Sequence, residues 1–304
     1  MSMEVFFLGT SASVPTPSRG LPCIAVRRRG ELILFDCGEG AQRQMMRAGV
    51  GFSRKMRVFI THLHGDHVLG LAGLLQTMSL MGREDKLYVY GPRGLKGFIE
   101  AVKEALGFSL TYEVEVNEVG EGVICRGEGY VVEAAYVEHS TPTLAYALIE
   151  DPRPGRFMPE RAEELGVPRG PLWKLLQRGE AVEVEGRVVR PEDVMGPPRR
   201  GLKIAYSGDT AYCEAMVKLA KGADLLIHEA TFDDSLADKA AEEKHSTASQ
   251  AAEVARLAGV KRLVLTHISP RYHDPSLLLN QASKVFKEVV VAEDFLRVEL
   301  NYED

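Results

Sequence analysis

Four side chains suited to metal binding, His62, His64, Asp66 and His67, lie within six residues, directly after the apolar run 57–60. Imidazole nitrogens and carboxylate oxygens are ligands that zinc accepts readily. A loop at the end of a strand can turn all four side chains toward one point. The alternative is a solvated, histidine-rich surface loop. Four potential metal ligands within six residues favour a metal site over such a surface loop.

Three more ligand candidates also follow apolar, strand-like runs. They are His139, Asp209 and His267. The ends of strands are where an α/β sheet presents its functional groups. Seven ligands without a cysteine exceed what a closed structural zinc site uses, so they favour two metal ions bridged by one carboxylate. Two zinc ions can lower the pKa of a shared water and aim it at an electrophile.

The elements that must position these groups follow a repeated order of strands and then strands alternating with helices. Helices are expected over 39–48, 68–81 and 95–106, and another ends near Ala258 after the capping box of Thr247 and Gln250. Strands are expected over the short apolar runs between turn residues, namely 3–8, 23–26, 32–35, 57–60, 86–90, 112–116, 130–137, 203–206, 224–228 and 262–266.

The stretch 151–198 lacks this periodicity and contains eight prolines. Long irregular insertions in compact domains are usually functional or disordered. We therefore expect one domain over residues 1–304, with an arm inserted over residues 151–198.

The composition excludes a disordered or fibrous chain, because 45% of the 304 residues are hydrophobic and 26% are charged. No run approaches the roughly 20 apolar residues of a membrane span. Residues 1–9 show no basic region leading a long apolar stretch, so a cytoplasmic protein is expected. The four cysteines form no CxxC pair, and we expect them to be reduced and buried.

The net charge of −6 argues at first against nucleic acid and for a small-molecule enzyme. Its distribution changes that view. Residues 1–60 contain nine Lys and Arg but four Asp and Glu, and residues 152–178 contain six basic and three acidic residues. Local basic surfaces can bind a phosphate backbone even on an acidic protein.

The HxHxDH pattern, followed by single His, Asp and His positions, resembles the metallo-β-lactamase superfamily. The resemblance implies an α+β fold, the αββα sandwich of two mixed sheets flanked by helices, with a dinuclear zinc site along one edge. It leaves the substrate open, since members of the superfamily hydrolyse several kinds of ester and amide.

Further segments are similar to one branch, the short form of ribonuclease Z. This resemblance implies a homodimeric, zinc-dependent endoribonuclease that removes the 3′ trailer from precursor tRNA by hydroxide attack and leaves a 3′-hydroxyl on the tRNA. The segments that carry it are residues 7–16, 34–40, 228–231, 245–247 and the arm sequences 154–157 and 165–171.

The resemblance also implies roles for single residues. Asp66 would accept a proton from the attacking water, and His245, oriented by Glu229, would protonate the leaving ribose oxygen. The alternative for His245 is a solvated residue without a catalytic role at the start of a helix. His228 is expected to donate a hydrogen bond in the core. The implied ligands are His62, His64 and His139 for one zinc ion, Asp66, His67 and His267 for the other, and Asp209 as the bridge.

The basic residues of the N-terminal loop and of the arm are expected to contact tRNA. One departure from the family is visible, because the family's Pro-x-Lys-x-Arg-Asn loop here has Pro17 at the lysine position and Gly20 at the asparagine position. Rejection of tRNA that already carries CCA is therefore in doubt. The expected substrate contacts are Arg19, Arg153, Arg156, Arg169 and Lys174.

Two other functions fit parts of the pattern. A small-molecule phosphodiesterase or arylsulfatase of the same superfamily would need the metal ligands but not the arm. A catalytically silent RNA-binding subunit would need the arm but not every ligand and the candidate acid. The presence of both sets favours the nuclease.

Overall fold

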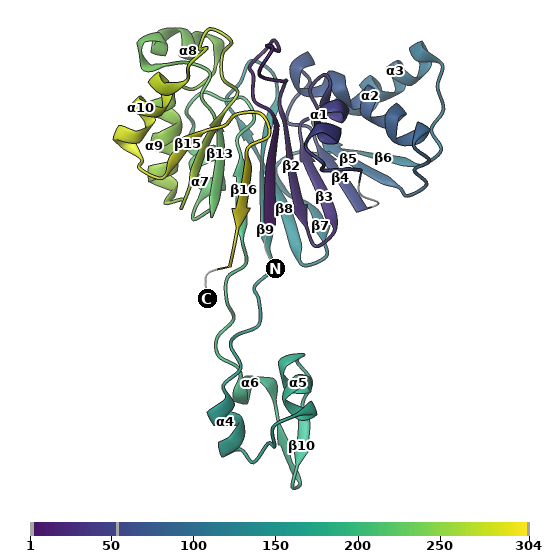
Figure 1. Ribbon diagram of the computed structural model, residues 1–304, viewed down its shortest axis with the longest axis vertical. Helices are drawn as coiled ribbons and strands as arrows, with labels where there is room; N and C mark the ends of the chain where they lie inside the picture. The colour runs from purple at the N-terminus through teal and green to yellow at the C-terminus, as the bar shows by residue number, and fades with distance from the viewer. Residues whose placement is uncertain (1–2, 53–54, 303–304) are drawn as a thin grey trace. The chain divides into compact units, whose positions relative to one another are not determined.

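The structure, a computed structural model, describes residues 3–52 and 55–302. The chain forms two compact units, one of Met1–Ile149 with Leu202–Asp304 and the other of Glu150–Gly201. The first unit contains two seven-stranded sheets (Figure 1).

The first sheet is mixed. It is parallel where helices α1 (Ala41–Arg47), α2 (Gly65–Leu80) and α3 (Leu95–Leu106) connect its strands, because parallel neighbours require such crossovers. The β2–β3 hairpin closes through Arg29 and Gly30, both at positive φ, as a two-residue primed turn requires. Its strand order is β16 (Arg297–Leu300), β1 (Met3–Gly9), β2 (Cys23–Arg28), β3 (Glu31–Phe35), β4 (Lys55–Phe59), β5 (Leu87–Gly91) and β6 (Val114–Glu118).

The second sheet repeats this plan. Parallel strands β12 to β15 are connected through helices α7 (Glu214–Ala220), α8 (Ala237–Glu243), α9 (Ala248–Ala258) and α10 (Ser276–Val285), with a short 3₁₀ turn at Asp234–Leu236. Its strand order is β15 (Val289–Val291), β14 (Leu263–Thr266), β13 (Leu225–Glu229), β12 (Lys203–Tyr206), β9 (Thr143–Glu150), β8 (Tyr130–Val137) and β7 (Gly122–Gly127).

Three apolar layers hold this unit together. The layer between the sheets is rich in aromatic residues, including Phe35, Phe59 and Tyr146, whose rings lie 5.5–6.0 Å apart. The outer layers place α1–α3 on the first sheet and α7, α9 and α10 on the second. Two sheets between two helical layers confirm the predicted αββα sandwich.

The predicted elements agree with the structure in most of this unit, with instructive differences. Strands β7, β9, β15 and β16 are absent from the expected set; in β9 the short apolar run 144–148 does not by itself distinguish a buried strand from a helical segment. Helix α2 begins at Gly65, three residues earlier than expected, because His64 takes the extended N-cap conformation and its carbonyl accepts from the His67 N–H (3.0 Å).

The second unit, expected to be irregular, is folded. It has an apolar cluster of its own, in which Ala162, Val167 and Leu176 pack with Val182 and Val189. Three of its prolines, Pro159, Pro171 and Pro191, start its helices, since proline suits the first helical turn. Its elements are α4 (Pro159–Glu164), α5 (Pro171–Gln177), β10 (Val182–Val184), β11 (Arg187–Val189) and α6 (Pro191–Val194).

All four cysteines are buried free thiols, as predicted. Within residues 3–52 and 55–302, none of the helices has the length and apolar character needed to cross a bilayer.

Candidate active site

The seven predicted ligands lie together at strand ends of both sheets. His62 and His64 follow β4, and Asp66 and His67 occupy the first turn of α2. The other three, His139, Asp209 and His267, follow β8, β12 and β14. The buried strands therefore fix the positions of the ligand residues at their ends.

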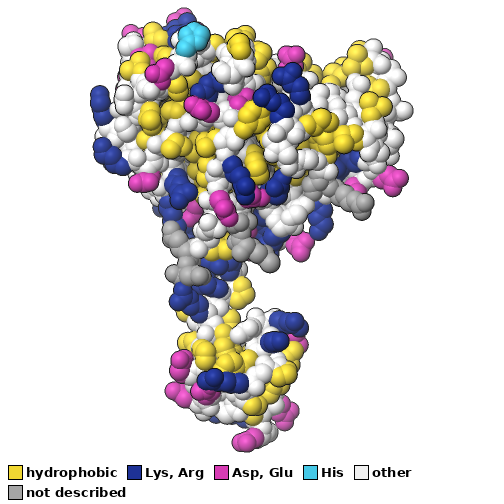
Figure 2. All heavy atoms as spheres, viewed as in Figure 1, with side chains coloured by type: hydrophobic (Ala, Val, Ile, Leu, Met, Phe, Trp, Pro, Cys, Tyr) yellow, Lys and Arg dark blue, Asp and Glu magenta, His cyan; other side chains and the backbone are white. Residues whose placement is uncertain are grey.

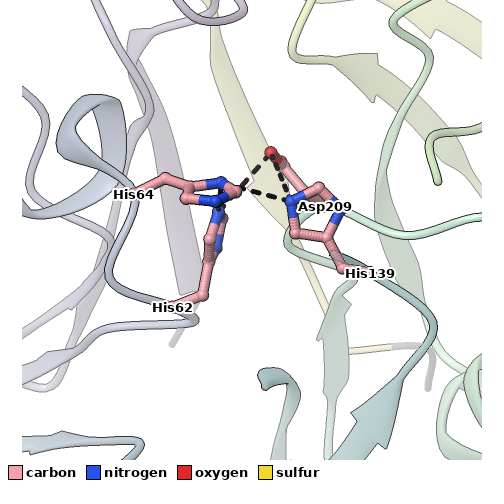
Figure 3. Close-up of side chains that lie close together, drawn as sticks. All are labelled: His62, His64, His139 and Asp209. Carbon is pink, nitrogen blue, oxygen red and sulfur yellow. Dashed lines mark hydrogen bonds and ion pairs between the residues drawn. The ribbon is translucent and has the colours of Figure 1, made fainter. Parts of the chain in front are cut away.

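The first group of ligands combines His62, His64, His139 and Asp209 (Figure 3). The Nδ1 of His64 lies 3.0 Å from Nε2 of His62 and 3.3 Å from Nε2 of His139. The Asp209 carboxylate lies 3.7 Å from Nε2 of His62 and 4.0 Å from Nε2 of His139. Three imidazoles and one carboxylate thus face a common point.

The second group combines Asp66, His67 and His267. The Oδ2 atom of Asp66 lies 3.6 Å from Nε2 of His67 and 3.5 Å from Nε2 of His267. Asp209 Oδ2 lies 3.3 Å from each of the same two nitrogens. Asp209 therefore reaches both groups, which is the position a bridging ligand requires.

The donor set fits a pair of bound cations. The buried atoms His67 Nε2, His267 Nε2 and Asp209 Oδ1 have no hydrogen-bond partner among the described residues, and such orphans are costly unless a ligand satisfies them. Burial lowers the pKa of His62 and of His139, which favours the neutral imidazole that binds metals.

Both carboxylates of the site are held ionised. Burial opposes the charge of Asp66, but the hydrogen bond and charge of His267 lower its pKa below the usual range. Burial likewise opposes the charge of Asp209, and the neighbouring His267 and His67 lower its pKa well below the usual value. An ionised pair of carboxylates among imidazoles is a site for divalent cations.

In His62, His139 and His267 the Nδ1 atom makes a hydrogen bond to a neighbouring oxygen. This bond fixes the ring so that Nε2 points into the site. Nδ1 of His62 bonds Thr61 Oγ1 (2.9 Å), and Nδ1 of His267 bonds Thr231 Oγ1 (2.8 Å). Nδ1 of His139 donates to the backbone carbonyl of Lys244 (3.0 Å), a residue at φ 54°.

Asp36 is the positioning residue that the sequence analysis missed. Its fully buried carboxylate accepts from His67 Nδ1 (2.7 Å), from the Thr61 N–H (2.7 Å) and from the Tyr206 hydroxyl (2.8 Å). It thereby ties the HxHxDH loop to both sheets. A signal was present, since Asp36 directly follows the apolar residues 32–35 of β3, just as the predicted ligands follow apolar runs.

Close backbone contact also fixes this loop. Gly70 of α2 lies against residue 38, and a Cβ at Gly70 would sit 1.8 Å from the Gly38 carbonyl oxygen. The Gly70 N–H donates to the Cys37 carbonyl (3.0 Å), and the Cys37 N–H donates to the His67 carbonyl (2.8 Å). A larger side chain at position 70 would push α2, and with it His67, away from the site.

The predicted acid pair is formed beside the ligands. Nδ1 of His245 lies 2.7 Å from Oε1 of Glu229, whose other oxygen accepts from Thr231 Oγ1 (2.7 Å). Burial disfavours the imidazolium, but the Glu229 carboxylate raises the pKa of His245 to about 9. The His245 ring lies 5.0 Å from that of His139 and 5.4 Å from that of His267. The His245–Glu229 pair thus lies beside the ligand cluster.

Of the remaining histidines, His228 has the expected place. The side chain of His228 is buried, and its Nδ1 donates to the Glu229 backbone carbonyl (2.7 Å). His273 is exposed in a loop. His245 lies two residues before Thr247, the N-cap of α9, and the predicted capping box with Gln250 is present.

The expected tRNA-contacting residues have varied surroundings. Arg19 is half-buried and its Nη1 donates to Thr10 Oγ1 and to the Ala292 carbonyl (2.6 Å each). Arg169 pairs with Glu163 (2.6 Å), while Arg156 and Lys174 are exposed. A contact of these residues with RNA stays a prediction. Figure 2 shows Lys and Arg side chains on both units, interspersed with Asp and Glu.

The αββα sandwich and its edge cluster of five histidines and two aspartates define a protein of metallo-β-lactamase fold. The family described as beta-lactamase superfamily domain matches residues 190–268, and that described as anti-Pycsar protein Apyc1 matches residues 3–148. The metallo-β-lactamase fold protein YhfI of Bacillus subtilis shares this fold, with a TM-score of 0.69 and 18% identity over 98% of this chain and 100% of that chain.

Full-length relatives narrow the family further. The ribonuclease Z of Methanosarcina acetivorans is 52% identical over 301 residues, 99% of each chain, and that of Myxococcus xanthus is 48% identical over 305 residues, also 99% of each. The crystal structure of human tRNase Z, short form, has a TM-score of 0.71 and 32% identity, covering 98% of this chain and 100% of that chain. The chain belongs to the ribonuclease Z family.

Proposed function

We propose that this protein is an endoribonuclease that uses two zinc ions to remove the 3′ trailer from precursor tRNA, leaving a 3′-hydroxyl on the tRNA. The observation that carries the proposal is the Glu229–His245 pair beside two groups of ligands joined by Asp209. A proton donor next to a dinuclear site suits cleavage of a diester whose leaving group is an alkoxide.

Each metal ion would have its own set of ligands. One ion would be held by His62, His64 and His139 and the other by Asp66, His67 and His267, and Asp209 would bridge the two. When bound, the two ions would supply an activated water and neutralise the charge of the phosphate. Asp66 accepts the proton of the attacking water. His245 donates its proton to the departing 3′-oxygen of the tRNA, and Glu229 holds the imidazole in place.

The test is cleavage of a precursor tRNA before chelation, after chelation and after zinc readdition, with the cut mapped at nucleotide resolution. We expect one metal-dependent cut at the 3′ end of the acceptor stem, and a product with a 3′-hydroxyl. A cut that survives complete metal removal would contradict the mechanism. Cleavage of small diesters alone would favour a small-molecule phosphodiesterase.

We propose that the unit Glu150–Gly201 is an arm that holds the tRNA. It has a core of its own, and its aromatic residues Phe157 and Trp173 pack on each other (ring centroids 5.0 Å apart), which leaves exposed arginines and backbone for the RNA. Contacts to phosphate and to RNA shape therefore suit it better than base stacking. The family membership supports a cytoplasmic homodimer.

Excision of this arm is expected to separate tRNA cleavage from chemistry. Arg153 and Arg199 form an antiparallel bridge (2.7 and 2.9 Å), so an Asn-Gly turn can replace residues 154–198. We expect kcat/KM for precursor tRNA to fall roughly 100-fold, because several phosphate contacts are lost. Hydrolysis of bis(p-nitrophenyl) phosphate should stay within about twofold. Equal loss on both substrates, or none on either, would count against a tRNA-binding arm.

A further inference from the structure

A pocket of about 290 Å³ lies beside the active site, between the loop after β1, helix α1 and the segment before β16. These three parts lie at the same end of the first unit (Figure 1). Residues 15–20 form one wall, Arg43 and Arg47 of α1 another, and Phe295 a third. The size is at the lower end for ligand pockets and suits about one nucleotide.

The pocket presents cationic groups that the protein does not neutralise. Arg43 is exposed and has no ion pair among the described residues, and Arg47 bonds only the neutral Gln44 amide (3.1 Å) and the Phe295 ring. The acids of the pocket are Glu39, which is exposed, and Asp294, whose carboxylate accepts from the Gly20 N–H, Thr10 and Gln44. Two guanidinium groups are therefore available for an anion.

Phe295 adds a strained aromatic surface to the same pocket. Its φ of 72° is a conformation that a bulky residue rarely adopts, and the carbonyl of Phe7 holds it there by accepting from its N–H (2.6 Å). The Arg47 guanidinium lies 4.6 Å from its ring centroid. Glycine would adopt this backbone conformation without strain. The presence of phenylalanine instead points to a function of the aromatic ring that offsets the backbone strain.

The pocket connects to the catalytic groups through the loop after β1. The loop that forms its wall also contains Ser13, whose N–H donates to Oδ2 of Asp66 (2.9 Å). In the proposed reaction the tRNA 3′-oxygen is at His245. A strand that continued from there past Asp66 would reach this loop with the nucleotides of its trailer.

We propose that this pocket binds the 3′ trailer of the substrate, with Arg43 and Arg47 contacting a trailer phosphate and Phe295 packing against a base. The proposal rests on the proposed function, since it names the site that receives the part of the RNA to be removed. Two guanidinium groups and an aromatic ring in one nucleotide-sized pocket match a phosphate with its attached base.

The test uses a 5′-phosphorylated uridine trinucleotide, which mimics the released trailer and reports binding without cleavage. Arg43→Ala combined with Arg47→Ala should weaken binding at least roughly tenfold and lower the salt slope of log K by about 0.7, the amount expected for one neutralised phosphate on a single strand. Phe295→Gly, which suits the positive φ, should weaken binding roughly tenfold with the salt slope unchanged. The control is Arg126→Ala with Arg262→Ala, the same loss of charge at exposed positions outside the pocket.

Cleavage assays then place the pocket on the trailer side. The Arg43 and Arg47 variant should lower kcat/KM for precursor tRNA but leave the inhibition constant of tRNA without a trailer unchanged. Unchanged trinucleotide binding, or equal weakening for trailer-free tRNA, would overturn the proposal. If the wild-type protein failed to cleave precursor tRNA, the proposed function would fall, and trinucleotide binding alone would decide whether the pocket takes RNA.

Discussion

Replacing Asp209 by alanine is expected to lower kcat/KM for precursor tRNA by at least about 10³-fold and to reduce the metal content of the protein. Asp209 Oδ2 lies 3.3 Å from Nε2 of both His67 and His267 and also faces the first group of ligands, so its loss affects both cation positions. A bound metal ion supplies several kcal/mol of transition-state stabilisation, and each 1.36 kcal/mol corresponds to a factor of ten in rate. Metal per subunit and initial rates measure the two effects.

The matched control is Asp224→Ala. Asp224 is also a buried aspartate next to a strand of the second sheet, but it precedes β13, whereas Asp209 follows β12. Its carboxylate pairs with Lys261 (3.0 Å) and accepts from the Lys203 N–H (2.8 Å). We expect this variant to lose thermal stability and to keep its metal and its activity per folded molecule. Full metal content in the Asp209 variant would exclude the bridging role.

Replacing His245 by alanine is expected to lower kcat for precursor tRNA by roughly 10²–10⁴-fold, the range for loss of a general acid. The metal content should stay within error of the wild type, because His245 makes its hydrogen bond to Glu229 and all seven proposed ligands remain. The Asp209 variant provides the contrast, since it loses both metal and activity. Metal loss in the His245 variant equal to that in His64→Ala would identify His245 as a ligand instead.

A change of leaving group separates proton donation from other roles of His245. A p-nitrophenolate leaves without protonation, whereas a ribose alkoxide needs a proton. The His245 variant should therefore hydrolyse bis(p-nitrophenyl) phosphate at nearly the wild-type rate. Glu229→Gln should show the same selectivity with a smaller effect, since Glu229 acts by positioning the imidazole. Equal losses on the two substrates would contradict the acid role.

The chemical groups of the site could be predicted from the sequence for a physical reason. Each ligand follows a buried strand, and such strands appear as apolar runs that a single sequence reveals. His139 and Asp209, for example, stand just beyond β8 and β12, whose bounds Tyr130–Val137 and Lys203–Tyr206 agree with the predicted runs. Strand ends meet at one edge of a sheet, so these residues could be expected to converge.

The unit Glu150–Gly201 shows where prediction from local sequence patterns fails. Its helices have four to seven residues and its strands three, too few for a hydrophobic period to emerge. What makes it a folded unit is the packing of Ala162, Leu176 and Val189, which come from three separate elements. Packing between distant short segments leaves no local periodic signal.

By itself the sequence determined the ligand types and their places at strand ends, because apolar strands and the polar groups at their ends are local features of the chain, while the sandwich and the candidate acid followed from its resemblance to a known family. Only the tertiary structure decided that Asp36 positions His67 and that Arg47 and Phe295 share a pocket. These relations depend on residues far apart in the chain meeting within a few ångströms, and the packing of the two sheets and their connecting segments sets those distances.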